Sequence, residues 1–185
     1  MKMRMNRRIR WRIVVLNALA LGAVSCGRTR MQTYIHNDIA GAATADWMAR
    51  TCLVGEDNHL EDRLLLDRAE VERFFLDVLK NGPDPKIVSD VEAAANHRFL
   101  ERQRLLATGS YLGLSDADIQ AARSLTRDEY LAQQRDDFVI RYKAQAVTGL
   151  GLLGGPAARA ALEAIAADAR SPLNGNAAAA LRQLK

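Results

Sequence analysis

Three glycines in the last quarter of the chain have the spacing of a phosphate-binding loop. Gly149, Gly151 and Gly154 spell G-x-G-x-x-G within the stretch TGLGLLGG. Such glycines let the backbone approach the pyrophosphate of a dinucleotide when a buried strand precedes them and a helix follows. The context of this motif therefore decides whether the chain is expected to bind a nucleotide cofactor.

The densest cluster of polar residues offers a second kind of chemistry, the binding of a divalent cation. Residues 56–62 read EDNHLED and place four carboxylates beside His59. The segment lacks the EF-hand order, because no glycine occupies the sharp-turn position. A solvated loop before a helix is the competing interpretation of residues 56–62.

The other candidate groups point to helix surfaces rather than to catalysis. His97 and Glu101 are four residues apart, which is the spacing of an ordinary surface pair on a helix. The chain contains no CxxC and no HExxH, and the sequence GSYLG at 109–113 lacks the order of a nucleophile elbow. We therefore assign no catalytic residue, no cofactor site and no metal ligand from the sequence.

The N-terminal segment has the organisation of an export signal. Its first 26 residues hold no acidic residue and six basic ones, Lys2, Arg4, Arg7, Arg8, Arg10 and Arg12. An apolar run, IVVLNALALGAVS, follows; at about 13 residues it is short for a bilayer span, and it ends in the small-x-small pattern of a cleavage site. Residues 1–25 are therefore predicted to be a signal peptide.

The residue after this cleavage site is Cys26. The sequence Ala23-Val24-Ser25-Cys26 resembles a bacterial lipobox, with alanine where that family usually carries leucine. The resemblance implies that Cys26 is acylated and that residues 26–33 tether the domain to the membrane. Gly27, which is not acidic, implies export to the outer membrane, with Arg28 and Arg30 near anionic head groups.

Two other fates of Cys26 remain open from the sequence. The protein is secreted with Cys26 as a plain thiol, or the leader stays uncleaved as an anchor. An acylated Cys26 leaves Cys52 as a lone thiol, whereas a free Cys26 in an oxidising compartment makes a Cys26–Cys52 disulfide possible.

The charge balance argues against nucleic acid as a partner. The whole chain has a net charge of +4, but without the six basic residues of the leader the acidic residues outnumber the basic ones by two. No dense basic stripe is left to follow a phosphate backbone.

The rest of the chain is expected to be all-α. Apolar residues recur at helical spacing, no segment alternates with a period of two, and aromatic residues make up only 5%. Residues 34–53 are weakly helical, with Ile35, Ile39 and Trp47 on one expected face. The clearer helices begin at three predicted capping boxes, at 67–70, 115–118 and 126–129. One of them ends at Asn81-Gly82-Pro83, and the next starts at Pro85.

The glycine motif is interpreted as the end of a helix in this context. The residues before Gly149 have apolar positions at helical rather than strand spacing, so the strand that a dinucleotide site needs is missing. Gly154-Gly155-Pro156 is typical of a helix exit followed by a helix entry. We expect three helices within 127–184, with breaks near 154–156 and 171–174, and no pyrophosphate pocket.

The same region carries a repeated pattern of small residues and leucines. It reads Ala146-Val147-x-x-Leu150-Gly151-x-Leu153-Gly154, then Ala158-x-x-Ala161-Leu162-x-x-Ile165. This resembles short HEAT-like helical repeats, and a shift of 31 residues superposes 146–153 on 177–184. The resemblance is clearest over 141–185 and implies an α-solenoid of stacked antiparallel helix pairs. The region 34–125 does not register with it, so the first half is either a degenerate solenoid or an irregular helical bundle.

These observations lead to one expected function and one alternative. A single all-α domain over 34–185, anchored through Cys26, is expected to be a non-enzymatic scaffold in the bacterial cell envelope, on the periplasmic face of the outer membrane. HEAT-like repeats imply a protein partner there, with no nucleotide and no nucleic acid. The alternative is a metal-binding or enzymatic accessory protein that uses the acidic segment 56–62.

Overall fold

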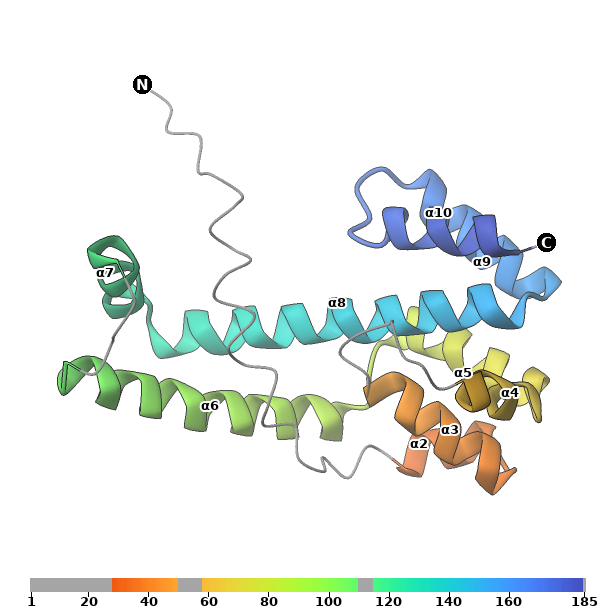
Figure 1. The fold of residues 1–185 in the computed structure, drawn as a ribbon, viewed down its shortest axis with the longest axis horizontal. Helices are drawn as coiled ribbons and strands as arrows, with labels where there is room; N and C mark the ends of the chain where they lie inside the picture. The colour runs from red at the N-terminus through yellow and green to blue at the C-terminus, as the bar shows by residue number, and fades with distance from the viewer. Residues whose placement is uncertain (1–27, 50–57, 110–114, 185) are drawn as a thin grey trace.

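The structure is a computed structural model that describes residues 28–49, 58–109 and 115–184. All of its regular elements in these ranges are helices, and no strand occurs there, so the predicted all-α class is confirmed (Figure 1). The helices are α2 (Arg28–Tyr34), α3 (Asp38–Ala49), α4 (Asn58–Leu65), α5 (Arg68–Asn81), α6 (Pro85–Ala107), α7 (Asp116–Ser124), α8 (Arg127–Leu153), α9 (Pro156–Ala167) and α10 (Asn174–Gln183).

The turn between α5 and α6 follows its local sequence. Gly82 ends α5 with a φ of 76°, a conformation that glycine adopts without steric cost. Pro85 is the first residue of α6, where a missing N–H costs nothing. The side chain of Asp84 accepts the Lys86 N–H at 2.8 Å and caps the new helix.

Two of the three predicted capping boxes are confirmed. Ser115 Oγ accepts the Asp118 N–H at 3.2 Å while the Asp118 carboxylate reaches back to the Ser115 N–H, which starts α7. Thr126 and Glu129 make the same reciprocal pair at the start of α8. Both satisfy N–H groups that the first turn of a helix leaves without partners.

The capping box predicted at 67–70 is wrong. Asp67 is the N-cap of α5, but its side chain makes no capping hydrogen bond. The Glu70 carboxylate instead accepts the His36 backbone N–H at 2.8 Å and lies 2.9 Å from His36 Nδ1. Glu70 thus ties the segment between α2 and α3 to α5, a contact across 34 residues that the local pattern does not encode.

The predicted face of the 34–53 segment needs correction. Tyr34 ends α2, and Asn37 starts α3 by accepting the N–H groups of Ile39 and Ala40 at 3.0 and 3.2 Å. This restart shifts the helical phase, so Ile39 is 56% exposed although its spacing predicts an inward position. The buried face of α3 consists of Ala40, Ala43, Thr44, Trp47 and Met48.

The segment expected to be a tether is largely helical. Residues 28–33 belong to α2, and Met31 is buried in the core. Arg30 forms an ion pair with Asp77 of α5, with 2.6 Å between Nη2 and Oδ2. The folded domain therefore begins before residue 34, and Cys26 and Gly27 lie outside the described residues.

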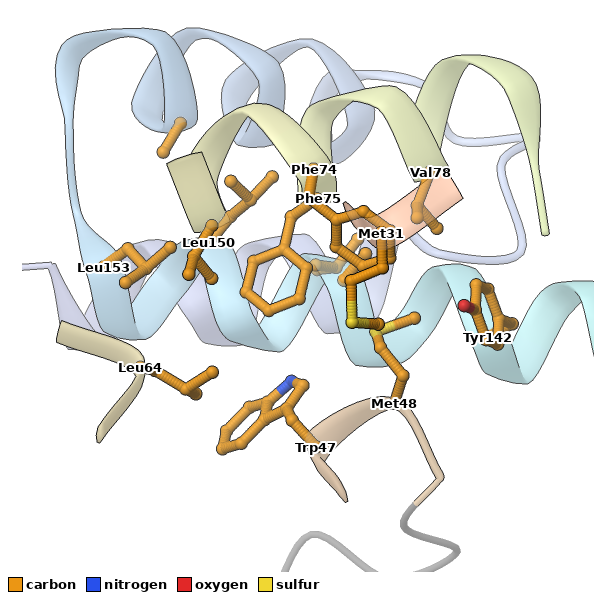
Figure 2. Packing of buried hydrophobic residues seen from close by; sticks show 14 of the residues in the cluster. Met31, Trp47, Met48, Leu64, Phe74, Phe75, Val78, Tyr142, Leu150 and Leu153 are labelled. Carbon is orange, nitrogen blue, oxygen red and sulfur yellow. The ribbon is translucent and has the colours of Figure 1, made fainter. Parts of the chain in front are cut away.

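The main core surrounds the C-terminal half of α8. Helices α3, α4, α5, α9 and α10 all pack on this half, as Figure 1 shows. Phe74 and Phe75 of α5 lie between Met31, Trp47 and Leu150 in the close view of Figure 2. Trp47 Nε1 donates to the Gln145 carbonyl at 3.0 Å, so its one polar atom is satisfied inside the core.

A two-helix arm extends from this core. Its two long helices are α6 and the N-terminal half of α8, with the short α7 at the far end, and the arm lies on the left of Figure 1. Two small apolar clusters hold it together: Ala95, Phe99 and Tyr130 in the middle, and Leu106, Ile119 and Ala122 at its far end. Because two helices have little shared interior, most of the arm surface stays in contact with solvent.

The last three helices match the predicted breaks. α8 ends at Leu153, α9 covers Pro156–Ala167 and α10 begins at Asn174. α10 packs on both α8 and α9, and Leu162 is fully buried, as its helical phase predicts. A stack of repeats needs several such steps, so the solenoid stays a prediction, and the choice between a degenerate solenoid and an irregular bundle for 34–125 stays a prediction with it.

Candidate functional site

The glycine motif lies within and at the end of a helix. Gly149 and Gly151 are internal residues of α8, and Gly154 is its left-handed C-cap, with a φ of 57°. Gly155 is the N-cap of α9, and Pro156 is the first residue of that helix. The predicted helix exit and entry are confirmed, and α8 occupies the place where a dinucleotide fold needs a strand.

Close helix packing explains the first two glycines of this motif. A Cβ atom on Gly149 would lie 2.3 Å from Phe75 Cε2, and one on Gly151 would lie 2.7 Å from the Ala180 Cβ. Glycine at these positions therefore lets α5 and α10 approach the backbone of α8 directly. The spacing of Gly149 and Gly151 is therefore explained by the contacts of α8 with α5 and α10, without a ligand.

Two charged side chains of α5 hold the corner between α8 and α9. The Arg68 guanidinium donates to the Gly154 carbonyl at the end of α8. Glu72, one turn further along α5, accepts the Ala158 N–H at 3.0 Å and so caps α9 in place of its own N-cap, Gly155. The helix N-terminus at which a pyrophosphate would bind thus already holds a carboxylate.

A hollow of about 500 Å³ lies beside this corner, where no pocket for a pyrophosphate was expected. It is lined by residues 151–156 together with Arg159, Gln183 and Leu184. Glu72 would repel a phosphate group placed near the α9 N-terminus. The hollow lies where the end of α8, the start of α9 and the end of α10 meet without filling the space between them.

The acidic segment is only partly within the described residues. Asn58, His59 and the residues up to Leu65 form α4 instead of the expected loop, and Leu60 is buried. Glu56 and Asp57 lie outside the described part of the chain. In the part that the structure describes, no three His, Cys, Asp or Glu side chains are grouped closely enough to hold a metal ion.

The candidate pair His97 and Glu101 lies on α6, in the arm. Glu101 lies 3.9 Å from Arg104 on the next turn, so this carboxylate pairs with an arginine instead of His97. Between α6 and α8, Arg135 Nη1 lies 3.6 Å from Glu92, and Arg127 Nε donates to Asn96 at 2.7 Å. These contacts hold the two helices of the arm side by side.

The arm also presents large apolar side chains to solvent. Leu100 is 57% exposed and Leu105 is 44% exposed, both on α6. On the inner side of α6, the Phe99 ring packs against Tyr130 of α8, with centroids 5.6 Å apart. The arm therefore has a thin apolar interior and two exposed leucines on one of its helices.

The predicted lipidation site, Cys26, lies outside the described residues. None of the helices that the structure describes combines the length and the hydropathy needed to cross a bilayer. The first described helix, α2, is fixed to α5: Arg30 pairs with Asp77 and also donates to the Gly82 carbonyl at 3.2 Å. The charge of Arg30, expected near lipid head groups, is thus neutralised within the fold.

Local sequence patterns did not reveal the residues that fix these junctions. Arg68 and Glu72 are four residues apart on α5, and both bind groups 86 residues away. Nothing in their spacing distinguishes them from an ordinary surface pair. Asn37 is the exception, because an asparagine before a helical run is a known N-cap signal.

No family model, curated protein or solved structure matches this chain.

Proposed function

We propose that the chain is a lipid-anchored, non-catalytic interaction protein of the bacterial cell envelope, whose arm contacts a protein partner. The leader and the lipobox-like sequence before Cys26 support the anchor. Acyl chains on Cys26 would hold the domain at the membrane, at about 0.8 kcal/mol for each buried CH₂ group.

The observation that carries the partner role is the shape and surface of the arm. Its helices share two small clusters, and Leu100 and Leu105 face solvent on α6. A projecting helix with exposed leucines suits binding to an apolar groove or to another helix, where exposed leucines become buried. No comparable arrangement of nucleophile, base or metal ligands among the described residues favours catalysis.

The anchor is tested by the substitution Cys26→Ser. The wild-type protein should sediment with membranes, whereas Cys26→Ser should move to the soluble fraction with unchanged helicity by circular dichroism. A Cys26→Ser protein that stays in the membrane pellet would assign the anchor to an uncleaved leader. A soluble wild-type protein would exclude a lipid anchor.

The arm is tested by photo-crosslinking in intact cells. A photoreactive amino acid at Leu100 or Leu105 should give one discrete adduct with another envelope protein. The same amino acid at Ala160, which is exposed on α9, is the matched control and should give none. Absence of adducts from both arm positions would contradict the assignment of the arm as the contact surface.

A further inference from the structure

A basic hollow lies where the end of α5, the start of α6 and the middle of α8 meet. Its volume is about 450 Å³. Lys80 lies on its α5 side and Lys143 on its α8 side, with Val88 and Ser89 of α6 also in its lining. A Cβ atom on Gly82 would lie 3.9 Å from Lys143 Cε, so this lysine extends along the turn after α5.

The two lysines differ from the other cations near this turn in their pairing. Arg30 pairs with Asp77, and Lys86 pairs with Asp90 at 2.8 Å. Glu92, which also lines the hollow, pairs with Arg135 of α8.

Within the described residues Lys80 and Lys143 form no ion pair. Their charges are therefore available to an external anion.

The hollow also lies close to the point where the chain would enter the membrane. Arg30 donates to the Gly82 carbonyl at the edge of the hollow. The four steps of the chain from Cys26 to Arg30 span at most about 14 Å even when fully extended. Since α2 is docked on α5 through Arg30 and Met31, an acylated Cys26 would keep this turn near the bilayer surface.

We propose that Lys80 and Lys143 bind the phosphate groups of anionic phospholipids and orient the domain with this hollow toward the membrane. The proposal rests on the lipid anchor proposed above and adds a second, electrostatic contact to it. It adds two lysines from distant parts of the sequence to the expected head-group contacts and removes Arg30, which pairs with Asp77. With two contacts to the membrane, the domain would keep one orientation, and the arm would keep a fixed direction relative to the surface. A single tether would let the domain rotate.

The test uses the mature protein, extracted from bacterial membranes in detergent and inserted into preformed vesicles. A membrane-impermeant amine reagent labels the lysines, and mass spectrometry measures the rate at Lys80 and Lys143. Vesicles of phosphatidylcholine alone are compared with vesicles containing phosphatidylglycerol. Each lysine should react about fivefold more slowly in the anionic vesicles, since a lysine near such a surface gains on the order of that preference.

A matched pair of variants separates this contact from general attraction. Lys86, next to Pro85 of the hollow, serves as the reporter lysine. Its protection in anionic vesicles should disappear in Lys80→Gln/Lys143→Gln. It should persist in Arg159→Gln/Arg182→Gln, which removes the same charge from α9 and α10, on the opposite side of α8 (Figure 1).

The experiment distinguishes a failure of the lysine contact from a failure of the lipid anchor. The mass of the N-terminal peptide shows whether Cys26 carries acyl chains, and an unmodified Cys26 would overturn both proposals. Equal labelling in both vesicle types with an acylated Cys26 would overturn only the lysine contact. Protection by inorganic phosphate in phosphatidylcholine vesicles would assign the hollow to a soluble anion and overturn the lipid contact.

Discussion

At the scale of single residues, Gly149 has a role in packing. Replacement by alanine would place a Cβ atom 2.3 Å from the buried Phe75 ring. Overpacking of this kind costs about 1–3 kcal/mol, which exceeds the gain of up to about 1 kcal/mol that alanine brings to a helix. Gly149→Ala should therefore lower the free energy of unfolding in urea. Gly175→Ala, with open space around its Cβ position, is the control and should be neutral or slightly stabilising; equal effects of both would contradict this packing role.

The carboxyl group of Glu70 makes the stability of the fold depend on pH in the acid range. Hydrogen bonds from the His36 backbone and side chain lower the pKa of Glu70 from 4.5 to about 2. A carboxyl group with a lowered pKa stabilises the fold above its unfolded value, and this contribution is lost as pH falls through the folded value. The excess stability of wild type over Glu70→Gln should therefore be fully present just above pH 4.5 and decline toward pH 2.

The measurement is the urea midpoint of both proteins at several pH values. Glu163→Gln, on the exposed face of α9, is the control acid and should show no such trend. A difference between wild type and Glu70→Gln that persists unchanged to about pH 2 would show that Glu70 acts through something other than its charge.

At the scale of helices, Glu72 of α5 acts as the cap of α9. Glu72→Ala would leave the Ala158 N–H without its partner, and losing a helix cap costs about 1 kcal/mol. The Ala158 amide should then exchange faster with D₂O in NMR, while Glu72→Gln, which keeps a carbonyl acceptor, should retain most of the protection. Unchanged exchange at Ala158 in Glu72→Ala would remove this role.

The long helix α8 packs in two different parts of the molecule. Its N-terminal half packs against α6 in the arm, and its C-terminal half is the centre of the main core. Both glycines inside α8, Gly149 and Gly151, lie in the second half, where five helices approach it. A single helix of 27 residues thus forms the centre of the core and one side of the arm.

At the scale of the whole molecule, the arm should open more easily than the core. Its clusters contain few apolar side chains, whereas residues 142–153 of α8 lie in the large core. Regions with few buried contacts open at lower free energy than the global unfolding free energy. Hydrogen exchange measured by mass spectrometry should therefore show faster exchange in 95–107 and 127–134 than in 142–153. Phe99→Ala should accelerate only the arm, and uniform protection along α8 would contradict an independent arm.

Local sequence signals predict the helices from Arg68 onward and most of their ends, but not α2 and α4. Gly82 and Pro85 mark one turn, the Ser115 and Thr126 boxes start two helices, and Gly154 to Pro156 separates α8 from α9. These signals work because a cap or a backbone conformation involves groups within about four residues of each other. The same locality argues against a dinucleotide-binding loop at the glycine motif, because the residues just before Gly149 have the spacing of a helix and not of a strand.

The partners of the charged and small residues, in contrast, follow from the packing of the helices. Glu70 fits a capping box but binds His36, Glu72 caps a helix 86 residues away, and Gly149 accommodates Phe75. Such contacts depend on which helices are brought together, and that depends on the summed burial of many side chains rather than on any one spacing. The juxtaposition of Lys80 and Lys143 has the same origin, because their distance is set by the packing of α5 on α8.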